Sequence, residues 1–327
     1  MQIAVLAGGV GGSRFVRGVR QAYPDATITV IVNTADDIIL HGLRISPDLD
    51  TMMYALGDGI DPDRGWGRAG ETWRTSAELA AYGVEPSWFG LGDLDLATHL
   101  VRTQMLDAGY PLSAVTQALC TRWLPDSDRL RLLPMTDDRV ETHVVIDDPQ
   151  KPSGSRAIHF QEYWVRLRAE PEARQVLQVG IEQARPAAGV EEAITDADLV
   201  LVAPSNPVVS IGPILGVTGI ADAIRGTRAP VIGFSGIIGG APVLGMAHRL
   251  LPAIDVEVSA AAVGRHYGSR RNGGTGLLDA WIVDNADADA VPELRSAGLF
   301  ADSTDLIMSD PTATAQFVSH GVKLATE

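Results

Sequence analysis

The sequence predicts an α/β protein with a Rossmann-like, doubly wound and mostly parallel sheet. Two observations lead to this fold class. Short β-branched runs such as Ile3–Ala7 and Leu199–Ala203 are apolar on both faces, as expected of strands that helices cover from two sides. Helical patterns alternate with these runs, and the first strand–loop–helix–strand unit spans residues 3–33, the usual size of a βαβ unit.

The expected elements continue this alternation along the chain. The strands are expected at Ile3–Ala7, Thr27–Asn33, Leu199–Ala203, Val231–Ser235, Asp255–Val258 and Ala280–Val283. The helices are expected at Ser13–Tyr23, Leu94–Ala108, Pro111–Arg122, Glu191–Asp196, Gly219–Gly226 and Pro242–Leu251. Strands that alternate with helices in this way favour parallel pairing.

Residues 126–190 depart from the alternation. Arg129–Pro134 and Arg139–Asp148 have the pattern of hairpin strands, and His159–Arg168 follows them. We therefore expect a small inserted subregion over the sheet. Because no repeat, low-complexity tract or linker interrupts the chain, residues 1–327 are predicted to form a single domain.

Composition narrows the class of function. The 327 residues carry a formal net charge of −15, which disfavours binding to nucleic acids or to anionic membranes. The single cysteine, Cys120, excludes an internal disulfide framework and a cysteine-rich zinc site. The N-terminus reads as a strand rather than a signal peptide, and no apolar run is long enough to span a bilayer. We expect a cytoplasmic protein that acts on small molecules.

A glycine-rich turn, AGGVGGSR at residues 7–14, follows the first expected strand. Glycines allow a ligand to approach the backbone, and the helix that follows offers free N–H groups to an anion, so the turn predicts a phosphate or nucleotide site. The turn lacks the third glycine of the dinucleotide fingerprint, because Arg14 stands there, and it lacks the lysine of a Walker A loop. The candidate contacts are Gly9, Gly11, Gly12, Ser13 and Arg14.

Acidic residues gather after the second expected strand, in VNTADD at 32–37 and SPDLDT at 46–51. This is the carboxyl edge at which open α/β sheets bind ligands. Asp36 and Asp37 could bind a ribose, whereas Asp48 and Asp50 could hold Mg²⁺, which prefers oxygen ligands. Asp48 could equally cap a helix over Leu49–Leu56, and His41 could be a buried structural histidine.

The motifs AGGVGGSR, VNTADD, HGL at 41–43 and SPDLDT, taken together, resemble the 2-phospho-L-lactate transferase family of coenzyme F-420 biosynthesis. The resemblance continues through APSNPVVSIGPIL at 203–215 and GFSGIIGGAPVLGMAHRL at 233–250, so it covers most of the chain. It is greatest to the actinobacterial branch, in which the transferred group is phosphoenolpyruvyl.

The resemblance implies a reaction, a cofactor and partners. The terminal ribityl hydroxyl of the deazaflavin FO attacks the phosphorus that bears the three-carbon acid of a GDP-activated phosphoenolpyruvate or 2-phospho-L-lactate, so the phosphoenolpyruvyl or 2-phospho-L-lactyl group is transferred to FO and GMP leaves. The family uses Mg²⁺ and is typically a homodimer. The implied catalytic residues are Asp50 and Asp37, with Asp48 and Asp50 as metal ligands; the sequence does not separate a base from a ligand.

Further candidates come from the later motifs and from the tryptophans. Ser205, Asn206 and Pro207 follow an expected strand and are predicted to contact the donor, as is Gly240. The acceptor contacts are predicted to be Asn33, Thr34, Asp36, His41 and Trp88. The family pattern has proline at the position of Gly236 and a basic residue at that of Ala241, so Arg14 is the remaining candidate to neutralise the donor phosphates.

Two other functions remain open on the sequence. A related bacterial family of nucleotide-sugar-binding regulators shares the glycine loop and the acidic motif that follows, but differs at SPDLDT. A nicotinamide-dependent oxidoreductase would need the missing third glycine. The transferase accounts for more of the motifs than either alternative.

Overall fold

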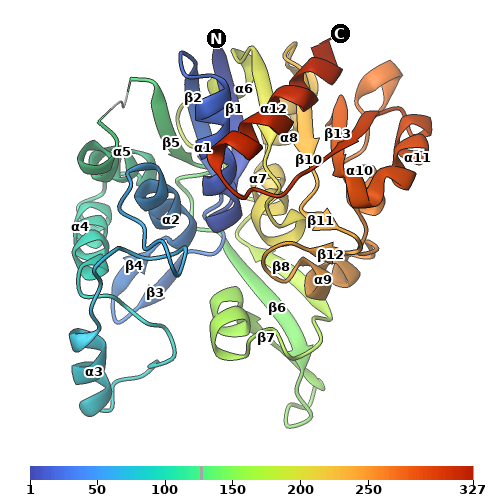
Figure 1. The fold of residues 1–327 in the computed structure, drawn as a ribbon. Coiled ribbons are helices and arrows are strands. Elements are labelled where there is room, and N and C mark those ends of the chain that lie inside the picture. The colour runs from blue at the N-terminus through green and yellow to red at the C-terminus, as the bar shows by residue number, and fades with distance from the viewer. Residues whose placement is uncertain (126–127, 327) are drawn as a thin grey trace.

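Seven parallel strands form the centre of the protein in the computed structural model, which describes residues 1–125 and 128–326. The strand order is β14-β13-β10-β9-β1-β2-β5 (Figure 1). The strands are β1 (Gln2–Ala7), β2 (Thr27–Val32), β5 (Leu130–Pro134), β9 (Leu199–Val202), β10 (Val231–Phe234), β13 (Ala280–Asp284) and β14 (Phe300–Thr304). This parallel sheet flanked by helices confirms the predicted fold class.

Each face of the sheet has its own hydrophobic core because side chains alternate along the strands. In β1, Ile3, Val5 and Ala7 belong to one core, whereas Ala4 and Leu6 belong to the other. The first core is covered by α1 (Val10–Ala22), α2 (Pro47–Leu56), α5 (Leu112–Trp123) and α12 (Pro311–Thr326). The second is covered by α6 (Val190–Thr195), α7 (Gly212–Gly216), α8 (Ile220–Gly226), α10 (Ala260–Tyr267) and α11 (Val291–Ser296).

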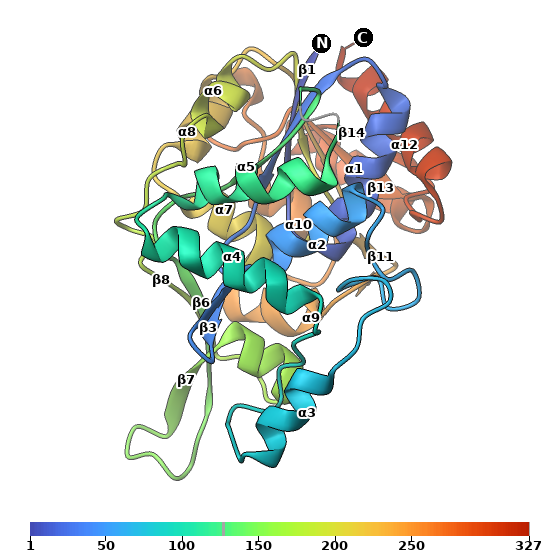
Figure 2. The same ribbon diagram turned by 90° about the vertical axis from the view of Figure 1, so that its left-hand side faces the viewer.

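A long crossover connects β2 to β5. It begins with the antiparallel hairpin β3 (Ile38–Leu40) and β4 (Leu43–Ile45), and continues through α2, α3 (Arg74–Ala81), α4 (Asp95–Asp107) and α5. His41 and Gly42 form the two-residue turn of the hairpin, both with positive φ, as a type I′ turn requires. Figure 2 shows α4 and α5 lying across the same side of the molecule, with α3 projecting beyond them.

The predicted insertion is a three-stranded antiparallel sheet in the order β7-β6-β8. It comprises β6 (Glu141–Asp147), β7 (Ser155–His159) and β8 (Gln175–Val179), with a π-helical turn η1 (Glu162–Arg166) after β7. The prediction of a hairpin strand at Arg129–Pro134 was wrong, since β5 pairs in parallel with β2 and belongs to the central sheet. Residues 126 and 127, at the predicted start of the insertion, lie outside the described residues.

Two other expected elements differ in the structure. Asp255–Val258 is not a strand: Asp255 has a φ of 57°, which breaks an extended backbone, and the alternating Val256 and Val258 belong to a loop packed against the core. The helix expected at Pro242–Leu251 is shorter, because Ala241–Pro242 is strand β12, paired with β11 (Ile237–Ile238). The helical part is α9 (Ala247–Leu250), followed by the 3₁₀ turn η3 (Leu251–Ile254).

The remaining helical turns are η2 (Pro207–Ile211), η4 (Arg271–Gly273) and η5 (Asn285–Ala290). Within the described residues, no single helix is long and apolar enough to cross a membrane; Pro207–Gly216 and Ile220–Gly226 meet that criterion only as a pair, with an 82° bend between them. Both the three-stranded sheet and α3 extend from the end of the molecule toward which β1 runs (Figures 1 and 2). They therefore border the carboxyl edge of the central sheet.

Candidate active site

The candidate site lies where the strand order of the central sheet reverses. β1 and β9 are neighbours, but the chain continues from β1 toward β2 on one side and from β9 toward β10 on the other. The loops after the two strands diverge and leave room for a ligand at this switch point. The Gly8 N–H donates a hydrogen bond to Ser205 Oγ at 3.1 Å, so the two loops are joined at their base.

The glycine loop turns directly from β1 into α1. Gly9 is the N-cap residue, no side chain caps the helix, and its first turn carries no acidic residue. The free N–H groups and the positive end of the helix dipole therefore suit an anion. A Cβ at Gly9 would lie 2.5 Å from Asp48 Oδ1, whereas one at Gly11 would have only the Pro204 carbonyl oxygen nearby, at 3.6 Å. Gly9 thus allows α2 to approach, while Gly11 leaves open space.

Of the other predicted residues of this loop, Gly12 and Ser13 are buried and Arg14 is exposed. Gly12 packs closely on Ala7 and Met52. The Ser13 hydroxyl is buried and donates to the Val10 carbonyl at 2.9 Å, so it serves the helix. The Arg14 guanidinium is exposed and lies beside Gly65, in the loop that follows α2. Arg14 therefore remains available for a charged ligand.

An acidic group faces the glycine loop. Asn33 Nδ2 donates to Asp48 Oδ2 at 3.0 Å, while Asn33 Oδ1 accepts from the Ala35 N–H, so this buried asparagine supports Asp48. Asp37 Oδ2 accepts from Ser46 Oγ at 2.6 Å. Among the described residues, no partner hydrogen bonds to the buried Oδ1 atoms of Asp36 and Asp37. Three carboxylates thus converge with part of their hydrogen-bonding capacity unused.

Burial and mutual repulsion raise the pKa values of this acidic group. Burial, followed by the charge of Asp48, raises the pKa of Asp36. Burial also raises the pKa of Asp48 to about 6, although the Asn33 amide and the Gly9 N–H oppose the rise. The pKa of Asp37 is raised by burial, against the hydrogen bond from Ser46. A bound cation would relieve the repulsion, so these residues fit the Mg²⁺ that the sequence resemblance implies.

Asp50, predicted as catalytic residue and metal ligand, lies on the other side of α2. Its carboxylate binds the guanidinium of Arg102 through both oxygens, with Arg102 Nη1 to Asp50 Oδ2 at 3.0 Å. His99 Nδ1 lies 3.7 Å from the same oxygen. Ligand atoms of Asp50, Asp95 and His99 lie within 4.8 Å of one another, a spacing that could also hold a metal ion. The structure therefore presents two acidic groups, on opposite sides of α2.

Sequence reasoning missed His99 and Arg102. Asp95, His99 and Arg102 lie at i, i+4 and i+7 of α4, which places them on one face of the helix. A polar stripe of this kind on an otherwise amphipathic helix is a usable signal, but its meaning depended on finding Asp50 opposite it.

The remaining predicted residues lie on separate loops. Asn206 Oδ1 caps η2 by accepting from the Val208 and Val209 N–H groups, and Pro207 begins that turn. Gly240 lies exposed in the turn between β11 and β12, with a φ of 79°. His41 is exposed in the β3–β4 turn. The half-buried Trp88 contacts Phe89 edge to face, with ring centroids 6.0 Å apart, on the segment after α3.

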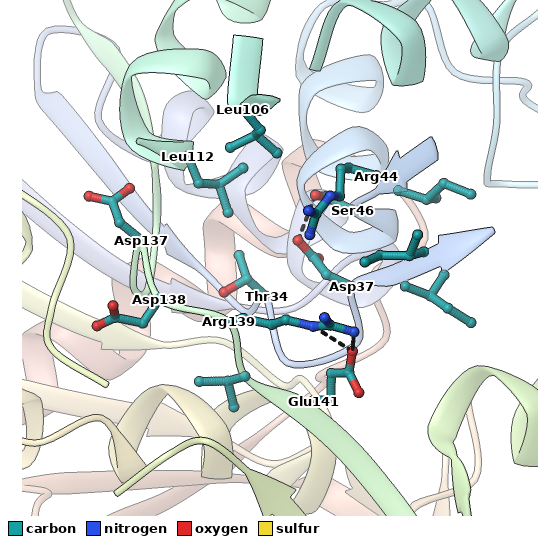
Figure 3. Close-up of a pocket in the computed structure, with 14 residues that line it drawn as sticks. Thr34, Asp37, Arg44, Ser46, Leu106, Leu112, Asp137, Asp138, Arg139 and Glu141 are labelled. Atoms are coloured by element: carbon teal, nitrogen blue, oxygen red, sulfur yellow. Dashed lines mark hydrogen bonds and ion pairs between the residues drawn. The ribbon is translucent and has the colours of Figure 1, made fainter. Parts of the chain in front are cut away.

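A cavity of about 120 Å³ opens beside Asp37 (Figure 3). Its walls come from the β3–β4 hairpin, the end of α4, the start of α5 and residues 137–141. The labelled polar groups around it are Thr34, Asp37, Arg44, Ser46, Asp137, Asp138, Arg139 and Glu141. The buried Thr34 Oγ1 has no hydrogen-bond partner among the described residues. The cavity therefore lies between Asp37 of the acidic group and the residues that lead into β6 of the inserted sheet.

Comparisons with known proteins identify the family of this chain. A family model described as 2-phospho-L-lactate transferase CofD matches residues 3–312. A phosphoenolpyruvate transferase of Streptomyces coelicolor is 59% identical over 100% of this chain and 99% of its own. Phosphoenolpyruvate transferases of Nocardia farcinica and Mycobacterium avium are 57% and 52% identical, each over 99% of this chain and over 95% and 99% of their own lengths.

A solved structure shares the fold at much lower sequence identity. A Bacillus halodurans protein of the UPF0052 family superposes with a TM-score of 0.60 and 16% identity, covering 97% of this chain and 98% of its own. At this identity, the likeness extends to the arrangement of helices and strands and no further.

Proposed function

The chain belongs to the 2-phospho-L-lactate transferase CofD family, and we propose that it transfers a phosphoenolpyruvyl group from a GDP-activated donor to the deazaflavin FO in coenzyme F-420 biosynthesis. That it is a phosphoenolpyruvate or 2-phospho-L-lactate transferase follows from the family and from relatives that are 52–59% identical. The GDP donor, the FO acceptor and the pathway rest on the sequence resemblance. The names of these relatives, phosphoenolpyruvate transferases, favour phosphoenolpyruvyl over 2-phospho-L-lactyl as the transferred group.

One observation carries the proposal: an open helix N-terminus and an acidic group meet at the switch point of the sheet. We assign the donor phosphates to the first turn of α1 at Gly11, with the exposed Arg14 nearby, whereas Gly9 is packed against Asp48. Ser205, Asn206, Pro207 and Gly240 line the β9 and β10 side and are assigned to the rest of the donor. Phosphoryl transfer depends mainly on positioning and charge neutralisation, which these groups would provide.

We assign the Mg²⁺ site to Asp48 and Asp36. The charge of Asp48 contributes to the raised pKa of Asp36, and Asp36 Oδ1 has no partner among the described residues. When bound, Mg²⁺ would neutralise donor phosphate oxygens. The predicted ligand role of Asp50 is less compatible with its surroundings, because Arg102 already binds both of its oxygens.

The transfer step requires an acceptor for one proton. The ribityl hydroxyl oxygen of FO bonds to the phosphorus that carries the three-carbon acid, the bond from that phosphorus to the GMP oxygen breaks, and the hydroxyl proton departs. We assign its acceptance to Asp37, whose Oδ1 has no partner among the described residues and whose pKa is raised by burial. Thr34, His41 and Trp88 are retained as candidate acceptor contacts, whereas Asn33 supports Asp48.

An Asp48→Asn variant tests the assignment. We expect Mg²⁺ affinity to fall at least about 10-fold and transfer to FO to fall with it, because a neutral amide cannot balance the cation. Calorimetric Mg²⁺ binding and the fluorescence of the deazaflavin product would be measured with synthetic GDP-activated phosphoenolpyruvate. Asp58→Asn, which removes an exposed carboxylate paired with Arg17, is the matched control. Unchanged turnover in Asp48→Asn would remove this residue from the mechanism.

The same preparation distinguishes the alternative function. Saturable binding of UDP-N-acetylglucosamine without any binding of FO would place the protein among nucleotide-sugar-binding regulators. A homodimeric state and a cytoplasmic location remain predictions, and light scattering of the purified protein would test the first.

A further inference from the structure

Arg102 is a fully buried cation beside the candidate site. Its side chain is 2% exposed and that of Asp50 is 6% exposed. The two form a bidentate pair, in which the two terminal guanidinium nitrogens bind the two carboxylate oxygens. Such a geometry fixes both side chains in orientation as well as in distance.

The pair belongs to a polar network that connects three elements. Arg102 Nη1 also lies 3.4 Å from the Arg44 carbonyl oxygen of β4 and 3.3 Å from His99 Nδ1. From the next residue of α4, Thr103 Oγ1 accepts a hydrogen bond from the Arg44 N–H at 2.8 Å. Tyr54 of α2 places its hydroxyl 2.5 Å from Asp95 and 2.8 Å from Thr98. Residues of α4 thus hold both α2 and the β3–β4 hairpin, and Figure 2 shows α4 beside both elements.

The rotation of α2 links this network to the switch point. Asp48 and Asp50 both lie in its first turn. Side chains two positions apart along an α-helix point in directions that differ by roughly 200° around the helix axis. Asp50 faces Arg102, so Asp48 faces the other way, toward Gly9 and Asn33. Because a helix turns as a rigid unit, fixing Asp50 also fixes the direction of Asp48.

We propose that Arg102 is a positioning residue: by holding Asp50 it sets the rotation of α2 and keeps the Asp48 carboxylate against the glycine loop. The role of Asp50 is then to anchor the helix rather than to hold the metal. A buried ion pair adds little net stability compared with apolar packing, but it fixes one arrangement, which is what this role requires. The inference rests on the proposed function for the identity of the metal and of the reaction.

The test uses Arg102→Lys, which keeps the charge but loses the bidentate contact. We expect Mg²⁺ affinity and kcat to fall about 10-fold or more, while KM for FO changes less than about 2-fold. The double variant Asp48→Asn/Arg102→Lys should be no worse than Asp48→Asn alone, because Arg102 acts through Asp48. Multiplicative losses in the double variant would overturn the inference.

A matched control separates positioning from folding. Arg270 forms another bidentate, largely buried pair, with Asp279 just before β13, at the opposite edge of the sheet. Arg270→Lys should lower the melting temperature without altering Mg²⁺ affinity. If Arg102→Lys likewise changes only the melting temperature, the role is structural and the inference fails.

A crystal structure of Arg102→Lys decides the question without metal or turnover. We expect the Asp48 carboxylate to lose its 3.0 Å contact with Asn33 Nδ2. If that contact persists, Arg102 does not position Asp48. If the contact is lost but wild-type protein transfers nothing to FO, the positioning role stands and the proposed function fails.

Discussion

At the residue scale, three neighbouring glycines have different reasons to be glycine. A Cβ at Gly8 would lie 2.5 Å from Ser210 Oγ, and one at Gly9 would lie 2.5 Å from Asp48 Oδ1. Gly11, inside α1, has no comparable neighbour. The first two glycines therefore permit close packing of protein groups, and only Gly11 is open toward a ligand.

This difference predicts that alanine substitutions at Gly11 and at Gly9 will affect different ligands. Gly11→Ala should raise the free energy of unfolding by up to about 1 kcal/mol, because alanine favours the helix. It should also weaken donor binding, because its methyl group enters the space assigned to phosphate. Gly9→Ala should lower Mg²⁺ affinity by about 10-fold, because Asp48 must move. Urea unfolding and calorimetry measure both effects; unaltered donor binding in Gly11→Ala would make the loop purely structural.

Cys120 reports on the interior beside the Arg102 network. Burial, followed by the charge of Asp50, raises the pKa of this thiol to about 12. We expect no reaction with a disulfide reagent at about pH 8 in the native state, and one thiol per chain after unfolding in guanidinium, since the thiolate is the reactive form. Rapid native labelling would show that this part of the core opens.

At the element scale, the inserted sheet supports the acidic loop. His159 Nε2, at the end of β7, lies 3.1 Å from the Asp37 carbonyl oxygen, and Gln161 Nε2 donates to that of Asp36 at 3.3 Å. His159 Nδ1 accepts from the Gln161 N–H at 3.1 Å. Both contacts are satisfied only by the neutral imidazole with its proton on Nε2. The insertion thus holds the backbone from which Asp36 and Asp37 project.

This arrangement predicts a pH dependence of stability. Burial lowers the pKa of His159 in the folded protein, below the value of about 6.5 expected when unfolded. The unfolded state therefore binds more protons at low pH, so this contribution is present above about pH 6.5 and is lost as the pH falls through the folded pKa. His159→Gln should reduce the loss of stability between about pH 7.5 and pH 5.5. The urea unfolding midpoint of each protein would be measured at both pH values. An equal shift of the midpoint in wild type and in His159→Gln would contradict this prediction.

The elements also show what the sequence could predict. The β1–loop–α1 unit was correctly predicted, because its pattern lies within consecutive residues. The strand predicted at Arg129–Pro134 was assigned to the wrong sheet, because its partner β2 lies about a hundred residues earlier in the chain. Asp50 was recognised as important, but its partner Arg102 lies 52 residues away and could be found only in three dimensions.

At the scale of the whole molecule, the C-terminal helix α12 holds α1 against the sheet. Phe15 of α1, Phe234 of β10 and Phe317 of α12 form a buried aromatic cluster, with ring centroids 5.1 to 6.1 Å apart. A Cβ at Gly18 of α1 would lie 2.2 Å from Thr314 Cγ2, so the Thr314 side chain of α12 packs directly on the α1 backbone. Helix α12 therefore stabilises α1, the helix to which the proposed donor site is assigned.

Removing the centre of this cluster should weaken the fold while leaving the chemistry intact. Phe317→Ala should lower the free energy of unfolding by about 3–5 kcal/mol, because it leaves a cavity in a tightly packed core. Phe317→Leu, which fills most of that volume, should cost less than about 1.5 kcal/mol. Since α12 meets α1 through its buried face and not at its open first turn, kcat measured well below the melting temperature should stay within about 2-fold of wild type. Urea unfolding of both variants, followed by transfer assays at low temperature, would measure the two quantities separately. Loss of turnover in a folded Phe317→Ala protein would mean that the packing of α12 controls the position of the glycine loop, and that donor binding depends on this packing.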